Sequence, residues 1–192
     1  MLLLALVLVF SSGFTLVATQ THEDPLVLDD FTDPRGISTW GTRWSAFTDR
    51  VMGGASDMDA DLHDDGVPHL HMTGDVRLEN NGGFVQVALP LDGNGQSFDA
   101  RAYRAVRLKV KGNGEGYYVH LRTDDTSAPW QYYAAPFSTS EEWSTVEIPF
   151  EEFEPRSLST ALDPSALRRV AIVAYGERMR ADVSIARIEL AR

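Results

Sequence analysis

Short runs of alternating apolar and polar residues follow one another along most of this chain. The clearest run lies at residues 105–111, where Val106, Leu108 and Val110 alternate with arginine and lysine. Residues 117–123 repeat the pattern. A period of two residues is typical of a β-strand with one buried face. Further strands are predicted at 26–31, 69–72, 75–79, 84–89, 130–137, 143–150, 170–175 and 183–190.

Glycine, asparagine and aspartate cluster between these runs at the spacing expected of an all-β sandwich. The pattern therefore predicts a single all-β domain, a jelly-roll β-sandwich. One short helix is expected at 164–169, because Asp163 suits the N-cap and Pro164 the first helical position. The acidic stretch 57–66 is expected to be a solvated loop rather than a calcium site, since Leu62 stands where an EF-hand needs glycine.

The first 18 residues carry no charged side chain and end in the small residue Ala18. Such an apolar run predicts a secretory signal peptide over 1–18, followed by a polar spacer over 19–25 and the folded domain over 26–192. An uncleaved membrane anchor is the alternative. The expected location is therefore the periplasm or the cell exterior, with an N-terminal anchor if the leader is retained.

Composition narrows the class of function. The chain has no cysteine, which excludes disulfides, thiolate metal ligands and cysteine nucleophiles, and an exported protein without disulfides fits a bacterial envelope. The net charge of −11 and the dispersal of the 17 basic residues argue against nucleic acid, polyanions and anionic membranes as partners. The chain lacks a nucleophile elbow, a His-Glu-x-x-His helix and a phosphate loop, so we predict a binding protein without a cofactor, not an enzyme.

Histidines offer one candidate for metal chemistry. His69 and His71 are two residues apart and so share one face of the strand predicted at 69–72. With His63 as a third ligand, they have the donor atoms of a zinc site. The simpler interpretation is a group of hydrogen-bonded surface histidines, and we predict no metal centre.

Two segments, 49–56 and 78–84, each contain a Gly-Gly pair beside carboxylate or amide groups. The second suggests a β-hairpin turn, because asparagine and glycine take the positive φ of a type I′ turn. In the first, Met52 is expected to be buried. Where the segments meet, their polar groups either satisfy buried backbone, the favoured role, or line a ligand site. The candidate ligand- or partner-binding residues are Asp49, Arg50, Glu79, Asn80, Asn81 and, as a neighbour, Arg122.

Four segments resemble the complex I intermediate-associated protein family in their order and spacing. They are the first Gly-Gly segment at 49–56, the second one extended to 74–89, and two later segments at 112–123 and 141–155. That family was first defined by an assembly factor of mitochondrial NADH:ubiquinone oxidoreductase. The resemblance covers roughly residues 27–190 and implies a galactose-binding-like jelly roll, in agreement with the strand pattern. The matching positions expected to shape the fold are Met52, Gly53, Gly54, Ser56, Gly82, Gly83 and Phe84.

Two functions are carried forward. The resemblance implies a non-catalytic protein that acts by protein–protein interaction in assembling a respiratory or other envelope complex, with membrane subunits of that complex as partners. The alternative is an exported carbohydrate-binding module of jelly-roll type, whose Trp130, Tyr132 and Tyr133 stack on sugar rings. A third hypothesis, an enzyme using Asp49 or Glu79 as acid or base, requires a raised pKa on one of them.

Overall fold

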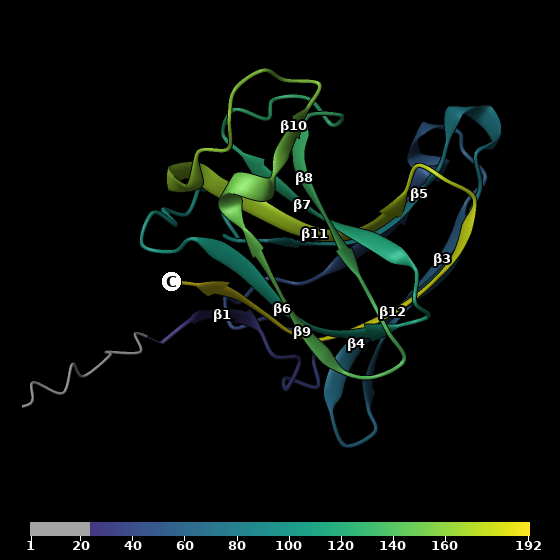
Figure 1. Cartoon of the computed structure of the whole chain (residues 1–192), viewed down its shortest axis with the longest axis horizontal. Coiled ribbons are helices and arrows are strands. Elements are labelled where there is room, and N and C mark those ends of the chain that lie inside the picture. The colour runs from purple at the N-terminus through teal and green to yellow at the C-terminus, as the bar shows by residue number, and fades with distance from the viewer. Residues whose placement is uncertain (1–23) are drawn as a thin grey trace, which may run out of the picture.

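The computed structural model describes residues 24–192, and the predicted signal peptide over 1–18 lies outside them. Two antiparallel sheets pack face to face (Figure 1). Sheet A contains β1 (Leu26–Asp29), β3 (Asp57–Asp64), β4 (Pro68–Val76), β6 (Ala105–Gly112), β9 (Ser144–Pro149) and β12 (Met179–Ala191). Sheet B contains β2 (Ser45–Thr48), β5 (Phe84–Pro90), β7 (Gly116–Thr123), β8 (Tyr132–Ser138), β10 (Glu154–Arg156) and β11 (Leu167–Tyr175).

The strand order in sheet A is β3–β4–β12–β6–β9, with β1 also paired to β12. In sheet B it is β10–β8–β7–β11–β5–β2. In the described part of the chain, four short 3₁₀ turns connect strands: η1 (Asp49–Met52), η2 (Glu79–Asn81), η3 (Phe150–Glu152) and η4 (Pro164–Ala166). The predicted all-β jelly-roll sandwich is confirmed. No helix within residues 24–192 is long and apolar enough to cross a membrane.

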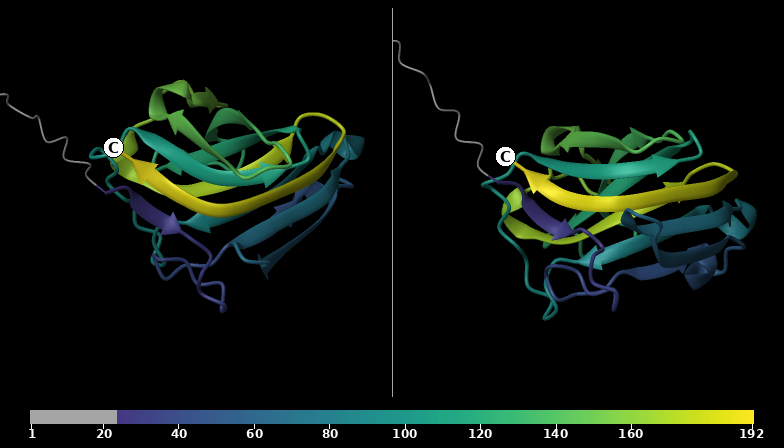
Figure 2. Two further views of the ribbon diagram at one scale, coloured as in Figure 1. Left: turned by 60° about the horizontal axis from the view of Figure 1, so that its bottom comes forward. Right: turned by 90° about the horizontal axis from the view of Figure 1, so that it is seen from below.

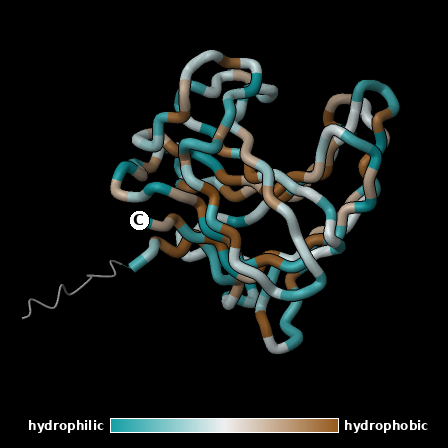
Figure 3. The backbone as a smooth tube through the Cα atoms, viewed as in Figure 1, coloured by the Kyte–Doolittle hydropathy of each residue, from teal (hydrophilic) through white to brown (hydrophobic). Residues whose placement is uncertain are grey.

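The core lies between the sheets and follows the period-two pattern. On β6, Val106, Leu108 and Val110 are fully buried, whereas Arg107 points outward and pairs with Glu147 on β9 at 2.7 Å. Burying a valine or leucine side chain fully stabilises the fold by roughly 1.5–3 kcal/mol. Figure 3 shows apolar positions recurring along the strands of both sheets. The alternation therefore determines which face of each strand is buried.

Both sheets bend in the same sense (Figure 1), and Figure 2 shows the bend from two further directions. Sheet A lies on the convex side of the sandwich. The outer face of sheet B, which points away from the core, lies on the concave side. Side chains on that outer face therefore converge more than side chains on a flat sheet would.

The predicted helix at 164–169 is wrong in length. Asp163 does cap it, accepting a hydrogen bond from the Ser165 backbone N–H at 2.8 Å, and Pro164 opens it. The turn nevertheless ends at Ala166, because Leu167 is fully buried and starts β11. Burial of this leucine outweighs the local helix signal.

The acidic stretch 57–66 is a strand for most of its length and not the predicted loop. It forms β3, at the edge of sheet A, where Met58 and Ala60 are turned partly inward and Asp59 and Asp61 are exposed. Because so many of its residues are acidic, the stretch is predicted to be a loop, although Met58 and Ala60 alternate with Asp59 and Asp61 as in an ordinary strand. Charged side chains on an edge strand also discourage unwanted pairing with another sheet.

The predicted hairpin at 78–84 is wrong as well. The local turn chemistry holds, since Asn80 and Asn81 have φ of 60° and 57°, and the Gly82 N–H donates to the Glu79 carbonyl at 3.0 Å. However, the strands predicted at 69–72 and 75–79 are mainly one strand, β4 in sheet A, whereas β5 belongs to sheet B. The turn therefore carries the chain from one sheet to the other.

Candidate functional site

The two Gly-Gly segments meet around the carboxylate of Asp49, which is fully buried. Its Oδ1 accepts from the Ser56 backbone N–H at 2.9 Å, and its Oδ2 accepts from Ser56 Oγ at 2.6 Å and from the Gly83 N–H at 2.5 Å. A Cβ at Gly54 would lie 2.2 Å from Asp49 Cγ, and one at Gly82 would lie 2.3 Å from Oδ2. Only glycine fits these positions, and the prediction that the segments pack together is confirmed.

The electrostatics of this corner favour a structural role. Burial alone would raise the pKa of Asp49, but hydrogen bonds from Ser56 and the Gly83 backbone outweigh it and lower the pKa. The pKa of Glu79 is also lowered, chiefly by the hydrogen bond from Arg178 at 2.8 Å. The acid–base hypothesis needed a raised pKa at Asp49 or Glu79, and neither carboxyl has one.

The remaining predicted binding residues of this corner face solvent. Arg50 donates through Nε to the Ser56 carbonyl at 2.9 Å and pairs with Asp57. Asn80 donates through Nδ2 to the Gly53 carbonyl at 3.1 Å. Asn81, with its positive φ, is exposed beside it. Of these side chains, Asn80 connects the two segments to each other, whereas Arg50 bonds within its own segment and to the start of β3.

Arg122 does not belong to this corner. It lies on β7 opposite Arg169 of β11, whereas the corner adjoins the Tyr175 end of β11, where the Gly176 N–H donates to the Gly83 carbonyl at 3.0 Å. The six residue-to-residue steps from Arg169 to Tyr175 span roughly 20 Å of strand. The prediction that Arg122 neighbours the glycine segments is therefore wrong. Which residues lie beside Arg122 is decided by the pairing of β7 with β11, which the local sequence does not show.

Met52 is 64% exposed, contrary to the prediction that it is buried. Its neighbour Val51 is 71% exposed and Leu78, in the other segment, is 45% exposed. The reason is local: η1 is a single turn, and Asp49 takes its buried side. We call Val51, Met52 and Leu78 the apolar corner.

A second candidate site lies on the outer face of sheet B. There Tyr118, His120, Tyr132 and Tyr175 form a continuous group, which we call the aromatic face. The rings of His120 and Tyr132 stack at 4.0 Å, those of Tyr118 and Tyr175 lie 4.5 Å apart, and those of His120 and Tyr175 lie 5.1 Å apart. The three tyrosines are half-buried, so part of each ring remains accessible.

His120 occupies the middle of the aromatic face. It is buried, and its Nε2 makes no hydrogen bond within the described part of the chain. Burial, and secondarily the charge of Arg156, lowers the pKa of His120 to about 3. The ring is therefore neutral near pH 7 and holds an unsatisfied polar atom beside three tyrosines.

Sequence reasoning found only part of this face. Of the three aromatic residues proposed to stack on sugars, Tyr132 belongs to it, but Tyr133 is a fully buried core residue and Trp130 is a loop residue that is 66% exposed. Tyr118 and Tyr175 were not singled out. The alternation in 117–123 places Tyr118 on one outward face with His120 and Arg122, and this signal identifies Tyr118. Tyr175 comes beside it through the pairing of β11 with β7, which the alternation does not show.

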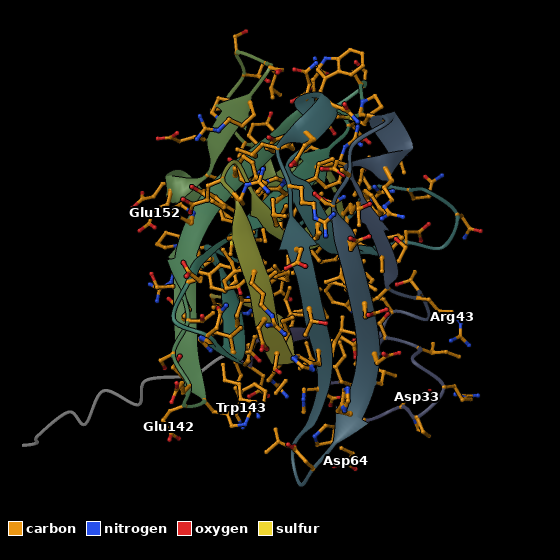
Figure 4. The ribbon with its side chains drawn as sticks, turned by 90° about the vertical axis from the view of Figure 1, so that its right-hand side faces the viewer. Asp33, Arg43, Asp64, Glu142, Trp143 and Glu152 are labelled. Carbon is orange, nitrogen blue, oxygen red and sulfur yellow. The ribbon has the colours of Figure 1, made fainter. Side chains whose placement is uncertain are left out.

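The three histidines share the outer face of sheet A. The ring centroids of His63, His69 and His71 lie 5.4–6.3 Å apart. His71 Nε2 bonds Asp182 at 2.8 Å, and His69 packs edge-on against Trp143 at 5.4 Å. Figure 4 shows Trp143 at the same end of the molecule as Asp64, the last residue of β3. Within residues 24–192, no group of three or more His, Asp or Glu side chains is placed to hold a metal ion.

Comparison with known proteins gives a family and a fold. Residues 29–181 match the family model of complex I intermediate-associated protein 30. No curated protein matches the chain. Among solved structures, the fold is similar to that of a family 11 carbohydrate-binding module from Clostridium thermocellum in complex with a β-1,3-1,4-mixed-linked tetrasaccharide. The two are 14% identical, with a TM-score of 0.67 over 87% of this chain and 95% of that one.

Two further structures share the fold. The family 11 module of the cellulosomal cellulase Lic26A-Cel5E of Clostridium thermocellum is 13% identical, with a TM-score of 0.68 over 88% of this chain and 94% of that one. A family 30 carbohydrate-binding module of a cellulosomal cellulase of the same organism is 14% identical, with a TM-score of 0.55 over 88% of this chain and 93% of that one. At these identities the likeness establishes the fold.

Replacing the buried carboxylate tests the structural role of the corner. In Asp49→Ala the N–H groups of Ser56 and Gly83 lose their acceptor, and each unsatisfied buried donor costs about 1–3 kcal/mol. We expect the free energy of unfolding in urea to fall by roughly 3 kcal/mol or more. Asp59→Ala, at an exposed position of β3, serves as the control and should change it by less than about 0.5 kcal/mol. Equal stability of the two variants would show that the carboxylate does not hold the corner.

The lowered pKa of His120 predicts a specific acid sensitivity. Because the folded pKa, about 3, is below the unfolded value, the unfolded chain binds a proton more readily. The contribution of neutral His120 to the free energy of unfolding is therefore fully present above about pH 6.5 and is lost as the pH falls toward 3. We expect stability measured between pH 7 and pH 4 to fall less steeply in His120→Phe than in the wild type. Tyr118→Phe should keep the wild-type slope, and an unchanged slope in His120→Phe would contradict the prediction.

Proposed function

The chain belongs to the complex I intermediate-associated protein 30 family, and we propose that it is a non-catalytic binding domain that holds a saccharide on the outer face of sheet B. The observation that carries this proposal is the aromatic face, in which three half-buried tyrosines surround the neutral His120.

The chemistry of this face suits a sugar. The apolar C–H side of a pyranose packs on an aromatic ring, while its hydroxyls need directional hydrogen bonds. Tyrosine supplies both a ring and a hydroxyl. The unsatisfied Nε2 of His120 gives one further polar partner for a hydroxyl.

The arrangement also favours binding without a large ordering cost. Tyr118 and His120 lie on β7, Tyr132 begins β8 and Tyr175 ends β11, so all four rings are on hydrogen-bonded strands. Rigid rings lose little conformational entropy on binding. The concave side of the bent sheet, where they lie, lets them contact several faces of one ligand.

Fold similarity supports the proposal without establishing it. A family 11 carbohydrate-binding module of similar fold was solved with a tetrasaccharide, and binding of such a ligand by this chain is our inference. We also propose that the chain is exported, as residues 1–18 predict, which would bring it into contact with saccharides of the envelope or the cell exterior.

Removing one ring at a time tests the saccharide proposal. We expect the β-1,3-1,4-mixed-linked tetrasaccharide, or another oligosaccharide of a neutral and acidic panel, to shift backbone amide signals of β7, β8 and β11 in NMR titrations. Tyr175→Ala and Tyr132→Ala should each weaken that binding by about fivefold, consistent with about 1 kcal/mol per aromatic contact. Trp143→Ala, just before β9 of the opposite sheet, should leave it unchanged. If no oligosaccharide shifts these signals at millimolar concentration, the proposal is wrong.

A second candidate function, protein docking in the assembly of a respiratory complex, is favoured by the apolar corner. Val51, Met52 and Leu78 are exposed side chains from two segments tied together by Asp49. Exposed apolar groups held on a fixed backbone are typical of protein interfaces. The partner we propose is a membrane subunit of complex I, in keeping with the family description.

This candidate is tested by recovering the tagged full chain from native membranes in mild detergent and quantifying complex I subunits. We expect Met52→Asp to reduce their recovery at least fivefold, because a charge in the apolar corner must be desolvated on docking. Trp130→Asp carries the same change at another exposed apolar residue and should recover wild-type amounts. Complex I recovery that is equal in both variants would exclude this corner as the docking surface.

A further inference from the structure

The aromatic face continues into a cavity lined by arginines. Along β7 the outward side chains are Tyr118, His120 and Arg122, and on β11 Arg169 stands opposite Arg122. A cavity of about 270 Å³ lies at this end of the two strands. We call the side chains of Arg122, Arg168 and Arg169, which line it, the arginine pocket.

A β-bulge presents two of these arginines together. Leu167 pairs with Thr123, but the next pair is Arg169 with Arg122, so Arg168 is an extra residue on β11. In regular alternation one of two successive side chains would point into the core. The bulge turns both arginines away from it, and bulges of this kind often re-aim side chains beside binding sites.

Arg169 has no partner of opposite charge. Its side chain is half-buried, yet the guanidinium makes no hydrogen bond or ion pair with any group among residues 24–192. Burial, and then the charge of Arg168, lowers its pKa. The chain carries 28 acidic residues and only 17 basic ones, so carboxylates are in excess as partners for arginine. An unpaired, half-buried guanidinium is therefore unexpected in this chain. Such a group reduces stability unless a ligand compensates it.

Arg122 is held in place by neutral groups. Its Nη2 donates to the backbone carbonyls of Thr126 at 3.0 Å and Ala128 at 2.8 Å. These bonds fix the guanidinium without neutralising it. Burial lowers its pKa, and repulsion from the like charges of Arg169 and Arg168 lowers it further.

The acidic groups near the pocket do not cancel this charge. Asp92 lines the cavity, but its Oδ1 accepts from the backbone N–H groups of Asn94 at 2.6 Å and Gln96 at 3.1 Å. Asp124 approaches only Arg168, at 3.6 Å. Three guanidinium groups and one carboxylate line the cavity, so its lining carries a net positive charge although the whole chain is negative.

We propose that the arginine pocket binds the carboxylate or sulfate group of an acidic sugar residue, so that the saccharide held on the aromatic face is an anionic one. This inference rests on the proposed saccharide function. Guanidinium groups match the oxygens of carboxylates and sulfates with paired hydrogen bonds. The protein's net charge of −11 repels long polyanions. The pocket is therefore proposed to recognise a single acidic sugar unit within a short oligosaccharide.

The test compares oligosaccharides of similar length by calorimetry at fixed ionic strength. The probes are tetragalacturonate, a sulfated carrageenan tetrasaccharide and the neutral mixed-linked tetrasaccharide. We expect at least one acidic probe to bind tenfold or more tightly than the neutral one, and comparison of the two acidic probes identifies the preferred group. Arg169→Ala should remove that preference, Arg169→Lys should retain part of it, and Arg180→Ala, an equal loss of charge on sheet A, should leave it unchanged.

Thermal unfolding separates this role from a structural one. Because Arg169 is half-buried and unpaired, we expect Arg169→Ala to keep or raise the melting temperature while it weakens binding of the acidic probe. Equal binding of neutral and acidic probes, lost in Tyr175→Ala but not in Arg169→Ala, would overturn this inference and leave the saccharide function standing. Absence of binding by every probe would overturn both.

Discussion

The buried carboxylate of Asp49 ties together two of the connections by which the chain passes from one sheet to the other. Asp49 directly follows β2 of sheet B, and its partner Ser56 directly precedes β3 of sheet A. The other partner, Gly83, directly precedes β5 of sheet B, after the chain has crossed back from β4. One carboxylate thus fixes both crossings against each other. The oxygens of Asp49 accept hydrogen bonds from both connections, at the N–H groups of Ser56 and Gly83. If either connection shifted, a buried N–H group would lose its hydrogen-bond acceptor.

This constraint extends to the aromatic face. Gly83 binds Asp49 through its N–H, and its carbonyl accepts from the Gly176 N–H just beyond β11. Phe84 then pairs with Tyr175, so the carboxylate holds the register at the end of β11 that carries this tyrosine. The position of Tyr175 on the aromatic face therefore depends on backbone hydrogen bonds at this end of β5 and β11. A corner that is structural in itself determines where one ring of the candidate binding face lies.

The sequence predicts what depends on local patterning. The alternation around Val106 and Leu108 predicts a strand and its buried face, and the Gly-Gly pairs predict a close approach of two segments, because both are short-range or depend on residue size. The identity of neighbouring strands is different. Nothing local shows that β4 and β5 belong to different sheets, or that Arg122 faces Arg169, since such pairings are chosen by burial of the whole core. The candidate face therefore could not be assembled from the sequence.

The energetics of the outer face of sheet B argue that it is a binding surface and not merely a stable one. Within the described residues, His120 Nε2 is the one buried side-chain polar atom without a partner, and Arg169 is a half-buried cation with none. Both lie on the same face, where β7 and β11 pair. Elsewhere the fold satisfies its buried polar groups closely, as at Asp49. Unsatisfied groups that collect at one place, beside accessible aromatic rings, are the expected result when a ligand supplies the missing partners.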